Sequence, residues 1–295
     1  MTSNNLPEAA LARHTAAVRR VIGARIRKVV LFVFLLGFAA FMIVPFFWVF
    51  ATSLRLPKDS FNLPPSFFPT AWFWSNYAYV FTAVPFATFI LNSLKVTLAI
   101  TFGQLLTAST AAYAFARMKF RGSGAAFVYL LSGLMIPYQS IIIAQFLMVS
   151  KMGFLDTHLA VILPYLANPF SIFLMRQFMQ TIPRSYDEAA LIDGANKFQT
   201  FWHVILPMSI PSLMVCSFLT FIYQWNNFFS GLIYLSTQIK YTLPMGMQLL
   251  KGYQSIGSLS TVLAGVMLSL VVPAIVFGFG QKYLVQGTVL SGLKS

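Results

Sequence analysis

Charged residues are scarce in this chain, and acidic residues are the scarcest. Only 9% of its 295 residues are charged and 58% are hydrophobic, whereas an ordinary soluble domain carries roughly a quarter charged residues. A water-soluble fold of this size could not cover its surface with so few charges. Lipid is therefore expected to surround much of the protein.

Several kinds of chemistry lack the residues that they need. The six acidic residues all lie outside the apolar runs, so a proton relay within a membrane is not expected. The single cysteine, Cys216, excludes an intramolecular disulfide, and the three histidines are scattered, which predicts no metal site. No G-x-x-x-x-G-K-[ST] loop is present to hold ATP phosphates. We expect no catalytic residue, and neither a metal nor a cofactor bound by this chain.

Six apolar segments are long enough to cross a bilayer, which requires about 20 residues each. They are predicted at 29–51, 89–112, 124–146, 158–178, 207–228 and 259–279. The first run is longer than the apolar part of a signal peptide, which is about 7–15 residues, so we expect it to be retained. The sequence predicts an all-α integral membrane protein with six transmembrane helices.

Basic residues are unevenly spread along the chain, which has a net charge of +14. Fourteen of the 20 lie in the two tails, after the second span and between the fourth and fifth spans. Because cytoplasmic segments collect Lys and Arg, both termini are predicted in the cytoplasm, and anionic lipid rather than nucleic acid explains the excess. We predict a basic cytoplasmic tail (1–28), a six-helix membrane domain (29–280) and a cytoplasmic carboxyl tail (281–295).

The connection between the fourth and fifth spans, 179–206, carries the signature of a short helix. Pro183 stops the preceding helix. Ser185-x-x-Glu188 predicts a capping box, in which the serine hydroxyl accepts a hydrogen bond from the amide N–H of Glu188. Gly194 permits a left-handed turn at the end. The pattern predicts a cytoplasmic helix of about two turns.

Small side chains in this helix would let the backbone of another protein approach closely. A capped helix lying on the membrane surface would have the same local chemistry, so the residues alone leave both interpretations open. The residues that would meet such a partner, and to which the resemblance given below would assign the coupling role, are Ser185, Glu188, Ala189, Ala190, Asp193, Gly194 and Ala195.

The same segment resembles a family signature. Glu-Ala-Ala followed by Asp-Gly-Ala and, after an interval, Leu-Pro resembles the coupling loop of binding-protein-dependent ABC importer permeases. The matching residues are Glu188, Ala189, Ala190, Asp193, Gly194, Ala195, Leu206 and Pro207. The runs 111–117, 225–228 and 241–244 resemble carbohydrate-uptake permeases, and the tail 287–294 is similar to that of the second permease of maltose-type systems. The resemblance implies a type I ABC importer permease fold with a cytoplasmic coupling helix.

The resemblance also implies a role and a set of partners. The chain would lie in a bacterial cytoplasmic (inner) membrane and translocate a sugar, an oligosaccharide or a related polyol, delivered by an extracytoplasmic solute-binding protein. It would pair with a second homologous permease and with a dimer of ATPase subunits that hold ATP and Mg. A phosphorylated polyol such as glycerol phosphate is an alternative cargo. An ATP-independent channel or facilitator is an alternative class, although a facilitator has no use for a coupling helix.

Neutral polar residues in the spans are candidates for the substrate pathway, because unsatisfied polar groups are costly in lipid. Hydrogen bonds between helices would explain each of them equally well. The candidates are Gln139, Gln145, Gln224, Trp225, Asn226 and Asn227. In the last outer connection, contact with the binding protein is expected from Gln254, Ser255, Ile256 and Gly257.

Overall fold

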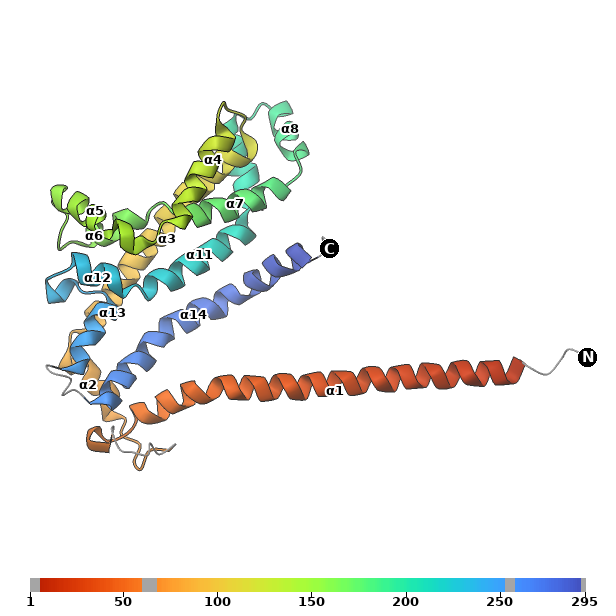
Figure 1. The fold of residues 1–295 in the computed structure, drawn as a ribbon, viewed down its shortest axis with the longest axis horizontal. Coiled ribbons are helices and arrows are strands. Elements are labelled where there is room, and N and C mark those ends of the chain that lie inside the picture. Colours follow the sequence, from red (N-terminus) through yellow and green to blue (C-terminus); the bar gives the residue numbers. More distant parts are fainter. Residues whose placement is uncertain (1–5, 60–67, 253–257, 293–295) are drawn as a thin grey trace, which may run out of the picture.

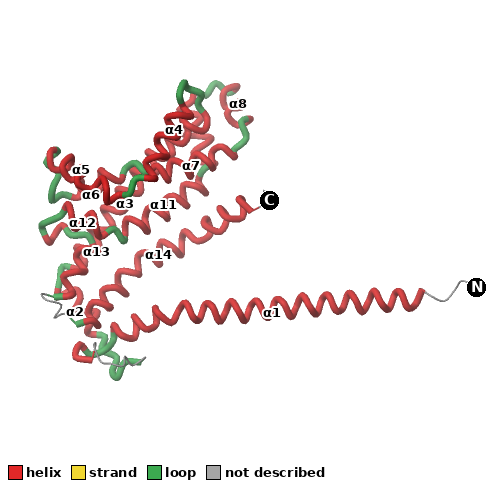
Figure 2. The backbone as a smooth tube through the Cα atoms, in the orientation of Figure 1, coloured by secondary structure: helices red, strands yellow, loops and turns green. Residues whose placement is uncertain are grey.

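The computed structural model describes residues 6–59, 68–252 and 258–292, and the side chains within these ranges from residue 22 to residue 282. Every regular element in these ranges is a helix or a helical turn (Figure 2). This confirms the predicted all-α class.

Three helices are long enough and apolar enough to span a bilayer without a break. They are α1 (Leu6–Ser53), α3 (Phe86–Arg117) and α14 (Leu259–Gly292). Each contains an apolar stretch of 24 to 32 residues, which exceeds the roughly 20 that a bilayer requires. The predicted first, second and sixth spans lie within them. Helix α1 includes Pro45 and helix α14 includes Pro273, and neither proline interrupts its helix.

The third and fourth predicted spans are bent pairs of helices rather than single rods, and the fifth, predicted at 207–228, becomes a bent pair that begins earlier, at Lys197, within the predicted connection 179–206. The third span bends by 101° between its two segments, the fourth span by 43° and the fifth span by 74°. Counting each pair as one span gives six. In the third span, α4 (Ser123–Ser132) and η2 (Gly133–Met135) form the first segment and α5 (Tyr138–Lys151) the second. In the fourth, α6 (His158–Ile162) and η3 (Leu163–Tyr165) precede α7 (Pro169–Thr181). In the fifth, α9 (Lys197–Thr200), η4 (Phe201–Ile205) and α10 (Leu206–Met208) precede α11 (Ile210–Trp225).

Proline explains where these breaks fall. Pro137 forces the preceding Ile136 into an extended conformation between η2 and α5. Pro169 is the first residue of α7, whose amide at Phe170 is capped by the side chain of Asn168 at 2.8 Å. The break before α11 falls at Ser209, just before Pro211, which lies in the first turn of α11, where its missing N–H is not needed.

Helices α3, α7 and α11 pack together as the centre of the molecule, and α14 packs against α11 and α1 (Figure 1). Helix α8 (Ser185–Ile192) lies at one end of this group. Helix α1 diverges from the rest beyond its contact with α14, and its side chains from Ile22 to Phe46 are exposed. This long apolar surface must contact lipid or another protein.

Short helices cover the end of α3 that is remote from α8, which we call the distal end (Figure 1). They are η1 (Pro57–Asp59), α2 (Ser75–Ala83), α12 (Phe228–Tyr234), η5 (Gln238–Lys240), α13 (Leu243–Gly246) and η6 (Met247–Lys251). Asn92 of α3 donates hydrogen bonds to the carbonyls of Ile239 and Tyr241, at 2.8 and 3.0 Å. Ser93 accepts one from the amide of Leu243 at 2.7 Å. The distal segment is therefore fixed to α3.

Candidate functional site

The start of helix α8 differs from the prediction. Arg184 already has helical dihedrals (φ −65°, ψ −24°), and its carbonyl accepts the amides of Asp187 and Glu188 at 2.9 and 3.1 Å. Ser185 is therefore the first helical residue and caps nothing. The predicted capping box is wrong because a capping serine must itself be extended, and the helix begins one residue too early for that.

The end of α8 follows the prediction. Gly194 has φ +81°, in the left-handed region. Its amide donates to the carbonyl of Leu191 at 3.1 Å, and the amide of Ala195 donates to that of Ala190 at 2.9 Å. These two bonds form a Schellman motif, which terminates the helix sharply.

A capping box does exist in this connection, one helix later than predicted. The side chain of Asn196 accepts the amide of Gln199 at 2.9 Å, and the side chain of Gln199 accepts the amide of Asn196 at 2.8 Å. The Asn-x-x-Gln spacing is visible in the sequence and could have revealed it. The Schellman motif at the end of α8 and the capping box at the start of α9 therefore fix the sharp turn between the two helices.

The outer surface of this region is apolar. Leu191 is 72% exposed and Ile192 is 86% exposed, and Glu188, Ala189 and Asp193 are exposed beside them, whereas Ala190 is buried. On α9 and η4, the rings of Phe198 and Trp202 stack with centroids 6.4 Å apart, and both side chains are exposed. Exposed apolar side chains gathered on a protruding helix are typical of a protein-binding surface.

The inner side of α8 is attached to the end of α3 by arginines. The Arg117 guanidinium, which is almost fully buried, forms an ion pair with Asp187 at 3.0 Å and donates to the carbonyl of Ile182 at 2.7 Å. In the opposite direction, Arg184 donates to the carbonyls of Arg117 and Ala116 at 3.1 and 2.9 Å. The contacts therefore run both ways between α3 and the segment that begins α8.

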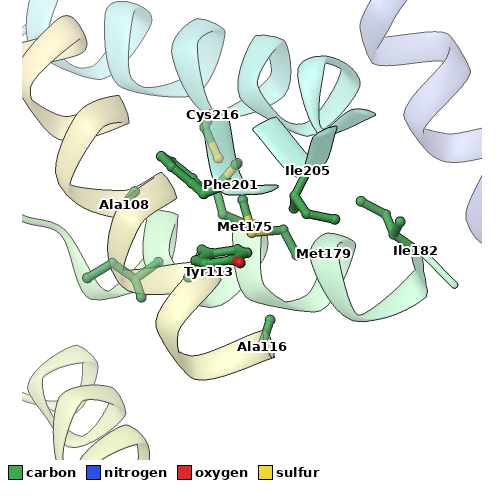
Figure 3. Close-up of a cluster of buried hydrophobic side chains, with 11 residues drawn as sticks. Ala108, Tyr113, Ala116, Met175, Met179, Ile182, Phe201, Ile205 and Cys216 are labelled. Carbon is green, nitrogen blue, oxygen red and sulfur yellow. The ribbon is translucent and has the colours of Figure 1, made fainter. Parts of the chain in front are cut away.

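A hydrophobic core supports this junction from within (Figure 3). Tyr113 of α3 packs against Phe201 of η4 with ring centroids 5.1 Å apart. Met175 and Met179 of α7 are fully buried beside them. Cys216 of α11 belongs to the same core, as expected of a small packing residue. The core binds α3, α7, η4 and α11 into one packed unit under α8.

A cleft of about 410 Å³ opens between α3, α7 and α11. Its polar lining consists of amides and hydroxyls, and no charged side chain of the described residues lines it. Gln104 is buried at its base and donates to Ser171 at 2.6 Å and to Thr220 at 3.0 Å. The polar residues that line the cleft are Gln104, Asn168, Ser171, Thr220, Tyr223 and Gln224. Sequence reasoning found only the last of these.

Hydrogen bonds continue from the cleft towards the distal end. Gln224 accepts from the side chain of Asn227 at 3.0 Å, and the amide oxygen of Asn227 accepts from the hydroxyl of Ser230 at 3.1 Å. The hydroxyls of Ser230 and Tyr165 are 2.8 Å apart. Two of the predicted pathway residues, Gln224 and Asn227, therefore belong to one chain of uncharged polar groups.

The remaining predicted residues are placed differently. Trp225 is buried and donates to a carbonyl of α14 at 3.2 Å, and Asn226 bonds its own helix. Gln139 is exposed, and Gln145 is half-buried with a side-chain oxygen that accepts no hydrogen bond. The structure thus does not bring these four residues into the cleft. The predicted binding-protein contacts at 254–257 lie outside the described residues.

An ion pair at the distal end was not predicted. Asp156, with φ +56°, accepts hydrogen bonds from Lys240 at 2.8 Å, from the Thr237 hydroxyl at 2.6 Å, and from the amides of Thr237 and Ser236, both at 2.9 Å. The Lys240 ammonium, followed by these other donors, holds the pKa of Asp156 well below its usual range. Asp156 therefore connects the α5–α6 loop firmly to the segment before α13.

Among the described residues, no three His, Cys, Asp or Glu side chains are arranged to hold a metal ion. The arrangement that remains is a polar cleft between helices and a protruding helix attached to one of them. Such an arrangement suits transport driven by a partner.

Comparison with known proteins finds one family over most of the chain. Residues 99–288 match the family described as the binding-protein-dependent transport system inner membrane component. The arabinooligosaccharides transport system permease protein of Halalkalibacterium halodurans is 32% identical over 83% of this chain and 87% of its own length. The galactooligosaccharides transport system permease protein of Bacillus subtilis is 32% identical over 88% of this chain and 93% of its own length. A bacterial ABC transporter involved in the import of the acidic polysaccharide alginate superposes with a TM-score of 0.75 at 25% identity, over 88% of this chain and 96% of the other.

Proposed function

The chain belongs to the binding-protein-dependent transport system inner membrane components, and from this premise we propose that it is a permease subunit of an ATP-driven importer of neutral oligosaccharides. It is a multi-pass inner-membrane protein of the ABC importer class. The family works with ATPase and substrate-binding partners. The particular partners and the cargo of this chain are what we propose.

The proposed coupling to ATP hydrolysis rests on the difference between the two faces of helix α8. Helix α8 exposes apolar Leu191 and Ile192 to the outside, while Ala190 is buried and Asp187 pairs with Arg117 of α3. A helix that is bonded on one face and apolar on the other can receive a partner and pass on its movement. We propose that a dimer of ATPase subunits, holding ATP and Mg, contacts Glu188, Ala189 and the rest of this face. Both termini and α8 then face the cytoplasm.

The cleft supports a neutral sugar as cargo. Sugars present many hydroxyls, and a lining of amides and hydroxyls bonds these without the desolvation that a fixed charge would impose. A phosphorylated polyol would need a positive charge there, and the described lining offers none. The two relatives are named for arabino- and galactooligosaccharides. We propose that Gln104, Tyr223 and Gln224 face the sugar as it passes.

A second homologous permease completes the pathway in this proposal. The cleft is open on one side, and one transport subunit alone leaves the apolar side chains of α1 and of α3 at Leu91, Leu98 and Phe102 uncovered. A similar subunit would cover part of these surfaces and close the cleft. An extracytoplasmic solute-binding protein would dock at the distal end.

The subunits can be tested by affinity purification of the tagged chain in mild detergent, followed by identification of the proteins that co-purify. We expect an ATPase and a second permease. Ile192→Ser should reduce recovery of the ATPase because it removes an apolar contact, whereas Phe120→Ser, on an exposed ring in the loop after α3, should not. Recovery of the chain without any ATPase would overturn the proposed coupling.

The cargo can be tested with the purified complex and its binding protein in proteoliposomes. We expect ATP-dependent uptake of labelled neutral arabino- or galactooligosaccharides, and neither glycerol phosphate nor alginate oligosaccharides should compete. Tyr223→Phe should raise the KM for uptake, and Tyr129→Phe, on the exposed surface of α4, should leave it unchanged. Transport of charged cargo alone would contradict the neutral-sugar proposal and would leave the ATPase coupling intact.

A further inference from the structure

We infer that Arg117 and Arg184 make α3 the helix that moves together with α8, so that the movement of the ATPase reaches the cleft through α3. These two residues, together with Arg176 of α7, which joins the same end of α3 to α7, are what we call the arginine lock. The inference rests on the proposed docking of an ATPase at α8, but the lock itself is a property of this chain and can be measured separately.

The lock occupies the carbonyl end of α3. The last carbonyls of a helix have no partner within it, and they carry the negative end of the helix dipole. Here Arg176 of α7 donates to the carbonyl of Phe115 at 3.3 Å, and Arg184 donates to those of Ala116 and Arg117. The Arg176 guanidinium also lies 4.0 Å from the ring centroid of Phe127 in α4. Two guanidinium groups therefore satisfy three successive carbonyls that would otherwise face water.

Arg117 provides the reverse connection. Its guanidinium reaches across to Ile182 and Asp187, which lie on either side of Arg184. Arginine suits this place because its planar group presents several donors in fixed directions. Because donors run from α3 to the α8 segment and from that segment to α3, neither can slide along the other without breaking several bonds.

The shape of the neighbouring helices favours α3 over the two helices that are joined to α8 through the chain. Helix α7 belongs to a pair bent by 43°, and α11 is separated from α9 by a bend of 74°. Helix α3 has 32 residues without a break. It passes Gln104, about 20 Å from Arg117 along the axis, and is bonded to the distal segment through Asn92 and Ser93. One rigid element thus joins α8, the cleft and the distal end.

The lock can be measured by pulsed electron spin resonance on the intact complex in nanodiscs. Spin labels on cysteines introduced at Ser185 in α8 and Thr110 in α3, both exposed, report their separation in a Cys216→Ala background. We expect a narrow distance distribution that ATP with vanadate leaves unchanged. Arg117→Gln or Arg184→Gln should broaden it. Arg121→Gln, which removes the same charge from an exposed position in the loop after α3, should not.

Function provides the second readout. Arg117→Gln should retain the ATPase subunits and ATP hydrolysis while uptake of the labelled neutral oligosaccharide falls by about tenfold or more, because a buried charged contact is lost. Arg117→Lys, which keeps the charge and one donor direction, should recover part of the uptake. An unchanged distance distribution, or wild-type uptake in Arg117→Gln, would overturn the lock. A wild-type chain that recruits no ATPase would instead overturn the docking proposal, while the spin-label distances would still decide whether the lock exists.

Discussion

The two ends of the molecule each contain a carboxylate paired with a cation, and the two pairs are built differently. Asp156 at the distal end accepts four hydrogen bonds, three of them from a single stretch of backbone and side chain at Ser236 and Thr237. Asp187 in α8 forms an ion pair with Arg117 of α3. The first pair joins two connecting segments that are far apart in the chain, whereas the second joins two helices.

This difference distinguishes a part of the molecule that is held in one shape, the distal end, from a part that can pass on the movement of a partner, the junction of α8 with α3. The distal pair is partly exposed, so water screens its charges, and its stability comes from many convergent donors. The pair at α8 is more buried, and its partner Arg117 is shared between a carboxylate and a carbonyl. Many bonds between two connecting segments fix the shape of the distal end, while a few bonds between helices fix their relative position. We therefore expect the same substitution, aspartate to asparagine, to impair transport at the α8 pair and to affect only stability at the distal pair.

The largest effect is expected from Asp187→Asn. The substitution keeps the size of the side chain but leaves the buried Arg117 guanidinium without its counter-charge, which costs about 3–5 kcal/mol when one partner of a buried ion pair is removed. Uptake should fall strongly while ATP hydrolysis by the complex continues. Asp156→Asn is the matched control, and it should preserve the ratio of transport to hydrolysis. Equal losses of that ratio in both variants would remove the distinction between the two ends.

The next effect is expected at Gly194, which tests whether a sharp end to α8 is needed. A Cβ at this position meets no atom within 4 Å, so any penalty comes from the left-handed backbone itself. Gly194→Val should cost about 1–2 kcal/mol and should reduce uptake. Gly194→Asn should cost less, because asparagine tolerates this conformation. The measurement is uptake per ATP hydrolysed, and equal behaviour of the two variants would argue against a conformational cause.

A smaller effect on stability is expected from acid at the distal end. Because the folded pKa of Asp156 lies below its unfolded value, its contribution to stability is complete above about pH 4 and is lost as the pH falls from there towards the folded pKa. Asp156→Asn should lower the melting temperature at pH 7 and should make it less sensitive to acid below pH 4. Thermal unfolding of the detergent-solubilised protein measures both. A variant with the same acid dependence as the wild type would remove Asp156 from this role.

The smallest effect is expected from Ser185→Ala. Since Ser185 is inside the helix and caps nothing, the loss of its hydroxyl should change helix stability by only a few tenths of a kcal/mol, in the favourable direction because alanine is the better helix former. Uptake should equal that of the wild type. A clear loss of uptake would indicate that the hydroxyl contacts the ATPase directly.

The features that could be predicted are those that depend on a short stretch of sequence. The apolar runs gave the three continuous spans, and Gly194 gave the end of α8. The bends could not be derived, because Pro45 and Pro273 remain inside unbroken helices while Pro137 stands at a bend of 101°. A proline removes one hydrogen bond wherever it occurs, and the packing of neighbouring helices decides whether the chain then turns.

The bonds that define the site join residues far apart in the chain. Arg117 and Asp187 are 70 positions apart, and Asp156 and Lys240 are 84 apart. Counting basic residues for topology treats Arg117 and Arg121 alike, although one is buried in an ion pair and the other is exposed. Sequence alone could not distinguish them, since the difference depends on which helix packs beside which.

The isolation of α1 has a consequence for biogenesis. Its principal partner within the chain is α14, which begins more than two hundred residues later. During synthesis the first span must therefore settle in the bilayer on its own hydropathy, which is the highest of the three continuous spans. A substitution that places a charge in the exposed stretch of α1 would then act at insertion, before any of the transport machinery has been made.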